Sequence, residues 1–544
     1  MKILFPSLLL SFSLCVESAL TKNILFIGVD DLRPDIASIY GQSEVKTPNL
    51  DKFISTSTTF RRSYCQIALC SPSRTSLLTG LRPDTTKVWS IGPYFRETMG
   101  DKGNSVVTLP QYFKLQGFYT IGVGKIFHPG TSSGGPSSSE GGGDGGWPFD
   151  PINGSWSEPY FFCDQFYNGT FQSPAMQNLP NAREANAGCV QSDACIECLR
   201  KADSYSGKHS WRGAKCDASC YPDGAVADEA VKRLNELKDM SEPFFLAVGF
   251  KRPHLGWMAP QSYFDLYDVN NVSLAQHRMP PKDMPRVAFS QNGEMCGMDD
   301  VQCEKDENGY ELVPESRHAE LRRAYYAAVS FMDSQLGRVL DALEETGLDQ
   351  NTAVVFWGDH GYQLGEHGLW CKITNFELAT RVPLVMRLPN HTNPGSESTA
   401  LVSLLDIYPT LLDIAGLPPN PSLEGRSFRS LLTDSSSDDT SSSSFNVSFS
   451  QFLRPNNTMG LSVRTSQYRF TWWGEFNTTS NNPIWSEPSE LELYDHINDS
   501  GTDFDAYENI NVAEDNPEIV SEMMGLLRSN FVVGTRTSNK FIYS

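Results

Sequence analysis

Short apolar runs separated by amphipathic stretches dominate the hydrophobic pattern of this chain. Five runs rich in β-branched residues are typical of strands that are buried on both faces of a parallel sheet. Two longer stretches, 225–238 and 318–343, carry apolar residues at helical spacing. Strands that alternate with helices predict an α/β domain with a mostly parallel sheet sandwiched by helices. The five predicted strands lie at 24–29, 119–123, 244–250, 353–357 and 383–388.

The pattern changes after residue 430. A Ser/Asp tract at 434–444 predicts a loop. The runs at 461–464, 468–473 and 491–494 are short and strand-like, which indicates a small antiparallel sheet. We therefore expect a large α/β domain over residues 19–430 and a C-terminal subdomain over residues 431–544.

The N-terminus has the features of a secretory signal peptide over residues 1–18. Lys2 precedes an apolar run at 3–16, and small residues near Ser18 suit cleavage. No later run reaches the roughly 18 continuous apolar residues that cross a bilayer, so we expect no stable membrane insertion. Eight Asn-x-Ser/Thr sites fit a secretory route. They are Asn153, Asn168, Asn271, Asn390, Asn446, Asn456, Asn477 and Asn498.

Twelve cysteines are present, and the loss of Cys15 with the signal peptide leaves an odd number. Thiols normally pair in an oxidising compartment, so one cysteine should serve another purpose. Eight cysteines lie between Cys163 and Cys303, and a Gly/Ser-rich stretch covers 130–146. Since no histidine pair there has zinc spacing, we favour disulfides that hold a loop-rich insertion at about 130–225 over a zinc site.

The formal net charge of −21 argues against a nucleic-acid partner, because like charges repel and no basic run compensates. A small anionic substrate needs only a local cationic pocket. An acidic surface therefore does not exclude one.

Polar residues gather where four of the predicted strands end. Ligand sites in open α/β sheets lie beyond the carboxyl ends of the strands, so these residues should meet. Asp30-Asp31 follows the first strand, Lys125 and His128 the second, His254 the third, and Asp359-His360 the fourth.

Three carboxylates in one place, those of Asp30, Asp31 and Asp359, need a cation between them to stay ionised. Oxygen ligands in this number suit calcium or magnesium. Capping of the following turn is the alternative for Asp30-Asp31, but the carboxylate at another strand end favours a metal. Further cations and hydrogen-bond donors suit an anionic ester, whereas a structural loop role fits His367 equally well. These further groups are Lys125, His128, His254 and Lys372.

Residues 70–74, CSPSR, followed by TSLLTG at 75–80, match a C-x-P-x-R signature at the head of an apparent helix. With these residues the chain resembles the type I, formylglycine-dependent sulfatases of the alkaline phosphatase-like superfamily. In that family a formylglycine-generating enzyme oxidises the signature cysteine during secretion. The resemblance implies that Cys70 is the special cysteine and that the substrate is a sulfated saccharide. It also implies a destination outside the cell or in a lysosome-like compartment.

The resemblance also assigns site residues. It implies one calcium ion bound by Asp30, Asp31, Asp359, His360 and modified Cys70. It places the remaining groups around the nucleophile and the sulfate, with His254 favoured over His128 as general acid. These groups are Arg74, Lys125, His128, His254 and Lys372.

Further motifs resemble a branch of the family that acts on sulfated uronic acids. Two departures leave the sugar open: the long insertion, and residues 255–258, which replace an expected proline and basic residue. Cys65 and Cys371 flank the expected site and could pair with each other. Two alternatives stay open, a phosphonate or phosphodiester hydrolase of the same superfamily and an inactive glycan-binding relative. The motifs are VDDLRPD at 29–35, GLRPDTT at 80–86, GKIFHPG at 124–130, KRPH at 251–254 and GDHGYQLGEHG at 358–368.

Overall fold

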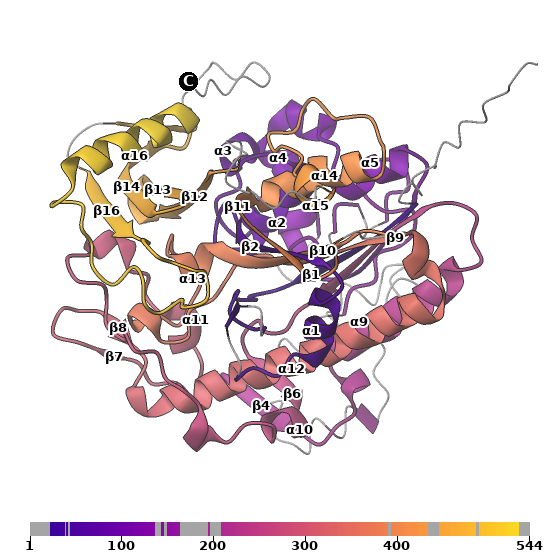
Figure 1. Ribbon diagram of the computed structural model, residues 1–544, viewed down its shortest axis with the longest axis horizontal. Coiled ribbons are helices and arrows are strands. Elements are labelled where there is room, and N and C mark those ends of the chain that lie inside the picture. The colour runs from indigo at the N-terminus through magenta and orange to yellow at the C-terminus, as the bar shows by residue number, and fades with distance from the viewer. Residues whose placement is uncertain are drawn as a thin grey trace, which may run out of the picture.

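A seven-stranded sheet in the order β11-β2-β10-β9-β1-β5-β3 forms the centre of the computed structural model (Figure 1). The structure describes residues 22–37, 40–41, 44–135, 143–145, 149–163, 194–195, 198, 208–389, 393–433, 445–485 and 489–531. The predicted signal peptide and the Ser/Asp tract lie outside these residues. The strands are β1 (Asn23–Val29), β2 (Thr58–Tyr64), β3 (Tyr119–Gly124), β5 (Phe244–Phe250), β9 (Thr352–Gly358), β10 (Arg381–Arg387) and β11 (Ser396–Ser403).

Helices cover both faces of this sheet, as the sequence predicts (Figure 1). Alternate residues of β1 point into two separate cores, Leu25 and Ile27 into one and Ile24 and Phe26 into the other. Helices α1 (Pro48–Ile54), α9 (Pro222–Leu237) and α12 (Glu315–Glu345) pack on the first face. Helices α2 (Cys70–Thr79), α5 (Leu109–Leu115) and α14 (Ile407–Ile414) pack on the second.

One strand direction differs from the expectation. The run at 383–388 is predicted as a parallel strand, but β10 pairs antiparallel with both β9 and β2. A strand buried on both faces has the same apolar pattern in either direction, so the pattern does not indicate whether the strand is parallel or antiparallel to its neighbours. Strands β2 and β11 are absent from the prediction because polar residues interrupt them, as in TTFRRSY of β2.

The predicted C-terminal antiparallel sheet is present. Strands β12 (Val447–Arg454), β13 (Thr458–Thr465) and β14 (Tyr468–Asn477) pair in sequence order, with β15 (Asn482–Pro483) and β16 (Glu490–Asp495) also on β14. Helix α16 (Pro517–Asn530) packs on this sheet through Met523 and Leu527. The sheet therefore has a core of its own.

A buried ion network joins the two sheets around Glu377. The Glu377 carboxylate lies 3.0 Å from Arg464 Nε, and it accepts hydrogen bonds from Arg469 and from the Tyr64 hydroxyl. Glu377 also lies within 4.8 Å of His496 and Glu508, a spacing that a metal ion could use. Because guanidinium groups already satisfy these carboxylates, the cluster works as an ion network.

Disulfides hold the cysteine-rich insertion, as the sequence predicts. Cys195 pairs with Cys220, Cys198 with Cys216, and Cys296 with Cys303. Cys65 and Cys371, which the sequence allows to pair, are both free and buried, and so is Cys70. Among the described residues, no helix is long and apolar enough to cross a membrane.

Residues 255–258, one of the two departures from the family pattern, take part in the packing of the fold. Leu255 is 1% exposed and Trp257 is 0% exposed. The segment forms strand β6 (Trp257–Pro260), which pairs with β4 (Trp211–Ala214) at the end of the insertion. Trp257 packs edge-on against Tyr325 and Tyr362. This departure from the family pattern therefore anchors the insertion to the core.

Stability should fall as the pH rises through the titration of Glu492. Burial raises the pKa of this carboxyl from 4.5 to about 7, although the Trp473 indole and the Tyr494 hydroxyl donate to it. A folded-state pKa above the unfolded value means that folding favours the protonated form. The contribution is therefore complete below about pH 4.5 and is lost as the pH rises through about 7, roughly 3 kcal/mol in all.

The neutral side chain of Glu492→Gln has no such titration. We expect denaturant unfolding at about pH 4.5 and about pH 8 to show a smaller pH-dependent loss of stability in Glu492→Gln than in the wild type. Equal losses in both proteins would contradict this assignment.

Candidate active site

The sequence-predicted site residues come together at one edge of the central sheet. Strands β9, β1, β5 and β3 are neighbours and run parallel, so their carboxyl ends lie side by side. Asp30-Asp31 follows β1 and Asp359-His360 follows β9. Lys125 follows β3, and His254 lies in the turn after β5.

Two facing glycines let β3 and β5 end this close together. A Cβ on Gly124 would lie 2.1 Å from the Gly249 carbonyl oxygen, and a Cβ on Gly249 would lie 2.1 Å from the Lys125 carbonyl oxygen. Gly124 also has a φ of +77°, which favours glycine. The backbone at Lys125 is therefore held against β5, and its N–H donates to the Gly249 carbonyl at 2.8 Å.

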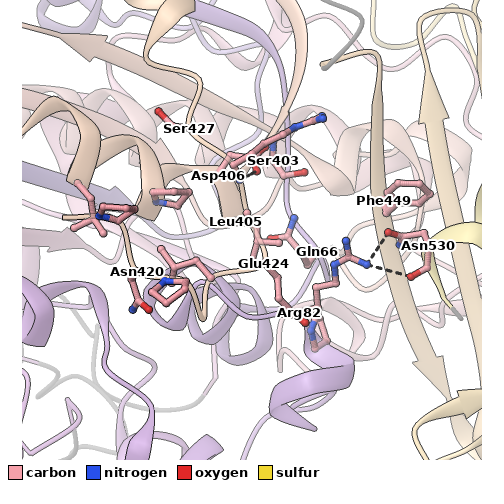
Figure 2. Close-up of a pocket in the computed structure, with 18 of the residues that line it drawn as sticks. Gln66, Arg82, Ser403, Leu405, Asp406, Asn420, Glu424, Ser427, Phe449 and Asn530 are labelled. Atoms are coloured by element: carbon pink, nitrogen blue, oxygen red, sulfur yellow. Dashed lines mark hydrogen bonds between the residues drawn. The ribbon is translucent and has the colours of Figure 1, made fainter. Parts of the chain in front are cut away.

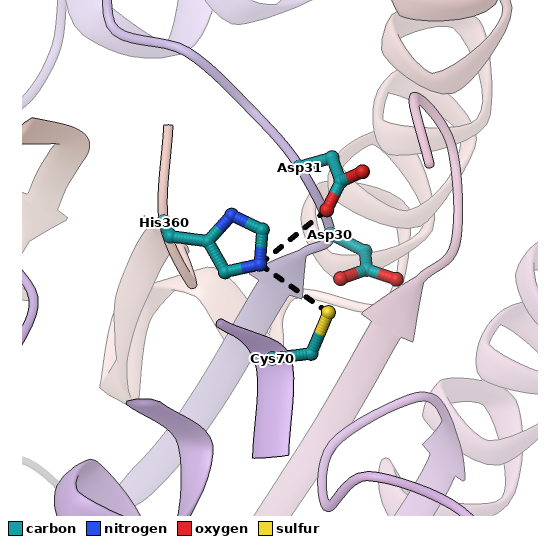
Figure 3. A group of neighbouring side chains, drawn as sticks. All are labelled: Asp30, Asp31, Cys70 and His360. Atoms are coloured by element: carbon teal, nitrogen blue, oxygen red, sulfur yellow. Dashed lines mark hydrogen bonds and ion pairs between the residues drawn. The ribbon is translucent and has the colours of Figure 1, made fainter. Parts of the chain in front are cut away.

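Four buried side chains form a compact set of metal donors (Figure 3). One ligand atom from each of Asp30, Asp31, Cys70 and His360 lies within 4.8 Å of the others. His360 Nδ1 is 2.9 Å from the Gly361 carbonyl oxygen and donates to it, which leaves Nε2 unprotonated. This Nε2 lies 3.3 Å from Cys70 Sγ and 3.4 Å from Asp31 Oδ1. Burial lowers the pKa of His360 and so favours its neutral, ligating form.

Asp359 lies beside this donor set. Its Oδ1 accepts hydrogen bonds from the backbone N–H of Asp31 at 3.1 Å and of His360 at 2.9 Å. Its Oδ2 accepts from Arg74 Nε at 2.8 Å. The third predicted carboxylate thus reaches the cluster and fixes the β1 turn to the β9 turn.

The two adjacent carboxylates have opposite pKa shifts. Burial raises the pKa of Asp31 well above its usual value against the opposing effect of Lys372, and the neighbouring Asp30 raises it further. Burial acts in the same direction on Asp30, but Lys125, His254 and Arg74 bring its pKa well below the usual range. Asp30 Oδ1 is buried without a hydrogen-bond partner and lies 3.5 Å from Arg74 Nη2. A buried carboxylate oxygen without a hydrogen bond, next to a second carboxylate, is an environment that a divalent cation fits.

Cys70 begins helix α2. The preceding Leu69 is extended, and all ten residues of the helix are buried, including Arg74. Burial raises the pKa of the Cys70 thiol well above its usual value, and the nearby Asp30 carboxylate adds to the shift. A thiolate is therefore disfavoured here, so an unmodified Cys70 would be a poor nucleophile.

Arg74 connects three parts of the site from inside helix α2. It donates to Asp359 through Nε and to the carbonyl oxygens of Lys125 and Ile126 through Nη1. Its guanidinium also lies 5.5 Å from the Trp357 ring. A planar side chain with several fixed donors suits this task.

Cationic and imidazole groups surround the donor set. Lys125 donates to Asp30, and Lys372 Nζ lies 3.0 and 2.9 Å from the two oxygens of Asp31. Although burial opposes their charge, Asp30 raises the pKa of Lys125 and Asp31 raises that of Lys372. Both lysines are therefore protonated.

The two histidines of this group are held by neighbouring backbone carbonyls. His128 Nδ1 lies 2.9 Å from the Pro129 oxygen, and His254 Nδ1 lies 2.6 Å from the Leu255 oxygen. Burial and then the nearby Lys125 lower the pKa of His128 to about 3. Burial and then Lys372 lower that of His254.

Sequence reasoning missed Glu294, whose carboxylate lies 2.9 Å from Lys372 Nζ and 3.6 Å from His254 Nε2. It also missed two ion pairs of Glu366 in the loop after β9. The pair with Arg33, at 3.1 Å, ties this loop to the β1 turn, and the pair with Arg322, at 3.0 Å, ties it to helix α12. Arg33 and Glu366 lie in quoted motifs and could have been found there. Glu294 stands in no motif or periodic segment.

His367 does not join the donor set. Its ring packs against Phe376 with the centroids 4.8 Å apart, and Nδ1 faces the Gln363 amide at 3.4 Å. This geometry fits the structural loop role for His367, which the sequence analysis gives as one of two possibilities.

A separate cavity of about 610 Å³ lies where the α14 region meets β12 and the end of α16 (Figure 2). Its charged groups are engaged with the chain. Arg82 donates to the carbonyl and the side-chain oxygen of Asn530, and Glu424 accepts from the Arg82 N–H and the Thr85 hydroxyl. None of the candidate site residues lines this cavity.

The fold and the site together define an alkaline phosphatase-like sulfuric ester hydrolase, and the chain belongs to the sulfatase family. The sulfatase family model matches residues 22–417. A second model, that of the C-terminal part of N-sulphoglucosamine sulphohydrolase, matches residues 365–528.

Among individual proteins, the chain is similar to iduronate 2-sulfatase. The enzyme of Mus musculus is 32% identical over 92% of this chain and 95% of its own length. The enzyme of Homo sapiens is 31% identical over 87% of this chain and 88% of its own. The phosphonate monoester hydrolase of Agrobacterium radiobacter has the same fold, with a TM-score of 0.67, 19% identity, and coverage of 94% and 96% of the two chains.

Replacement of Arg74 by lysine should weaken both the fold and the site. A lysine donates from a single atom, so the acceptors at Asp359, Lys125 and Ile126 cannot all stay paired. Each buried group left unpaired costs about 1 to 3 kcal/mol. We expect Arg74→Lys to lower the unfolding free energy by about 2 to 4 kcal/mol, measured by denaturant unfolding with tryptophan fluorescence.

The matched control is Arg429→Lys, because Arg429 is exposed and pairs with Asp413 at the surface, at 3.0 Å. Its effect should stay below about 1 kcal/mol. Equal stability of Arg74→Lys and the control would show that Arg74 does not hold the site together.

Proposed function

We propose that this chain hydrolyses sulfate esters of saccharides with an oxidised Cys70 as nucleophile and one calcium ion as cofactor. One observation carries the proposal. Four buried donors from three distant segments converge, one of them the first residue of α2, and cationic side chains surround them.

The donor set fits a hard divalent cation. Asp30 and Asp31 supply carboxylate oxygens, His360 presents an unprotonated Nε2, and Asp359 lies next to them. Carboxylate oxygens in this number suit calcium or magnesium better than softer metals. Calcium is our choice, since it tolerates irregular arrangements of oxygen ligands. In this proposal Asp30, Asp31, Asp359, His360 and oxidised Cys70 hold the ion.

The cysteine at position 70 stands in for a formylglycine. The hydrated aldehyde would supply a hydroxyl as nucleophile toward sulfur, with the bond from sulfur to the alcohol oxygen broken, and the cation would supply positive charge to that hydroxyl and to the sulfate oxygens. The raised pKa of the buried thiol fits this proposal, because an unmodified thiol would be a poor nucleophile at this position. A formylglycine-generating enzyme is the partner that the proposal requires during secretion.

The surrounding residues bind and orient the sulfate group. Arg74 keeps residue 70, Lys125 and Asp359 in fixed positions. Lys125 and Lys372 are buried ammonium groups that can donate to sulfate oxygens, a contribution of typically about 3 to 4 kcal/mol per donor in a dry site. With their raised pKa values, the lysines hold their protons too tightly for efficient acid catalysis.

Proton donation to the leaving alcohol then falls to a histidine. His254 presents Nε2 toward Lys372 and Glu294, whereas its Nδ1 is held by the Leu255 carbonyl. His128 is held in the same way by Pro129, and burial lowers the pKa of both histidines. In keeping with the family resemblance, we assign His254, whose Nε2 lies beside Glu294, as the general acid and His128 as a sulfate ligand.

A sulfated uronic acid is the first substrate to test. The support for it is the similarity to the iduronate 2-sulfatases at 31% and 32% identity over most of the chain. Desulfation of defined 2-O-sulfated uronic acids, measured against other sulfated saccharide fragments, would identify the sugar and the sulfate position.

We further propose a secretory protein that carries N-linked glycans and reaches a lysosome-like compartment or the cell exterior. Six of the eight Asn-x-Ser/Thr asparagines lie in the described residues, and all six are exposed, as an acceptor must be. They are Asn153, Asn271, Asn446, Asn456, Asn477 and Asn498.

A phosphonate ester hydrolase remains the second candidate because of its matching fold. Turnover of an aryl sulfate and of the matching aryl phosphonate monoester separates the two. We expect the sulfate ester to have the higher kcat/KM. A higher value for the phosphonate would reverse the assignment.

Replacement of Cys70 by alanine should abolish turnover while the fold is retained. Alanine cannot be oxidised to the aldehyde, so the nucleophile is lost. We expect at least a thousandfold drop in kcat, on the order of the loss of an essential nucleophile, with an unchanged thermal midpoint within a few degrees. Cys65→Ala is the control, since Cys65 is also a buried free thiol, and it should keep its activity.

A mass spectrum of the peptide that contains residue 70 accompanies this test. Wild-type protein from a eukaryotic secretory host should show the aldehyde in place of the thiol. Substantial sulfate release by Cys70→Ala, or an unmodified thiol in fully active enzyme, would refute the nucleophile.

A further inference from the structure

A carboxylate lies among the cations that should bind the sulfate. Glu294 Oε2 is 2.9 Å from Lys372 Nζ, and Oε1 is 3.6 Å from His254 Nε2. Lys372 already pairs with Asp31, so Glu294 adds a second negative charge to it. A pocket built only to attract an anionic ester would have no acid at this position.

The position of Glu294 is fixed from both sides. It lies in α11 (Gly293–Cys296), whose last residue is tied to Cys303 by a disulfide. The preceding Asn292 is fully buried, and both the nitrogen and the oxygen of its side-chain amide form hydrogen bonds. Its Nδ2 donates to the Glu311 and Gly368 carbonyls at 2.8 and 3.0 Å, and its Oδ1 accepts from the Trp370 N–H at 2.6 Å. Met295 anchors the other side in the core at 0% exposure.

Glu294 lies on the solvent side of the two groups that it contacts. Its side chain is 32% exposed, compared with 4% for Lys372 and 13% for His254. A substrate that approaches Lys372 and His254 from solvent therefore meets the Glu294 carboxylate. The part of the substrate next to the sulfate, the alcohol, has to lie close to it.

We propose that Glu294 is a specificity-determining residue that competes with sulfate for Lys372 and His254. In the free enzyme its carboxylate is the internal counter-anion of these two groups. A sulfate ester takes the place of Glu294 beside these two groups and leaves Glu294 facing the alcohol part of the substrate. This inference rests on the proposed function and adds the charge preference of its site.

Two consequences follow from this one charge. Free sulfate, the product, binds less tightly than the surrounding cations alone would allow, so it is released more readily. A sugar that presents a hydroxyl or ammonium group next to the ester can donate to Glu294, whereas a carboxylate there is repelled. The site therefore selects against a second anionic group close to the reacting sulfate.

The test compares Glu294→Gln with the wild type, using inorganic sulfate as competitive inhibitor and an aryl sulfate as substrate. Glutamine has nearly the same shape but no charge, so sulfate should bind at least about tenfold more tightly to the variant. A thermal-shift titration with sulfate reads the same affinity without turnover. Glu307→Gln is the control, since it removes one exposed charge from the same segment and should leave the inhibition constant unchanged.

A matched substrate pair tests the second consequence. It consists of a 2-O-sulfated hexose with a free 3-hydroxyl and the same hexose with a second sulfate on that neighbouring oxygen. Glu294→Gln should raise kcat/KM for the disulfated sugar relative to the monosulfated sugar by about tenfold.

The outcomes separate this inference from the proposed function. Tighter sulfate binding together with the shifted substrate ratio supports it, because damage to the structure would weaken binding. Unchanged or weaker sulfate binding, or an unchanged ratio, overturns it. A wild-type protein that cleaves no sulfate ester at all would instead overturn the proposed function.

Discussion

Charge burial is the constraint on which the rest of the structure depends. Asp30, Asp31 and Asp359 are completely buried at one edge of the sheet, where an unpaired carboxylate is very unfavourable. Each of them is answered by a cation from another segment: Asp30 by Lys125, Asp31 by Lys372 and Asp359 by Arg74. Asp30 Oδ1, which has no hydrogen bond, and the unprotonated His360 nitrogen are donors that one further positive charge could use. The proposed nucleophile position, sulfate ligands and metal site therefore follow from one electrostatic requirement.

Because these counter-charges come from separate elements, the site depends on how those elements pack. Helix α12 supports the β1 turn, since the Tyr325 hydroxyl donates to the Asp31 carbonyl at 2.7 Å. The C-terminal sheet takes part through Arg454, which donates to the carbonyl oxygens of Ile373 and Val287 at 2.9 and 3.0 Å. Ile373 is next to Lys372, and Val287 precedes the segment of Glu294. The second sheet thus helps to place both Lys372 and Glu294.

Much of this arrangement could be predicted from the sequence, and the reason is geometric. Parallel strands end at a common edge, so Asp30, Lys125, His254 and Asp359 had to meet once their strands were recognised. The predicted direction of β10 was wrong, because an apolar run that is buried on both faces is the same for a parallel and an antiparallel strand. Strand β2 was missed because Arg61 and Arg62 interrupt its apolar pattern. Glu294 could not be found, since its position depends on Asn292 and a disulfide, which leave no periodic signal.

The central claim is that Asp30, Asp31, His360 and an oxidised residue 70 form a cation site. The metal content of the purified, secreted protein is its most direct test. Elemental analysis after gel filtration in buffer without added metal measures it, and the account predicts about one calcium ion per chain. Fully active protein that holds no divalent cation would contradict the account, because the reaction would then proceed without the ion that the donor set is proposed to bind.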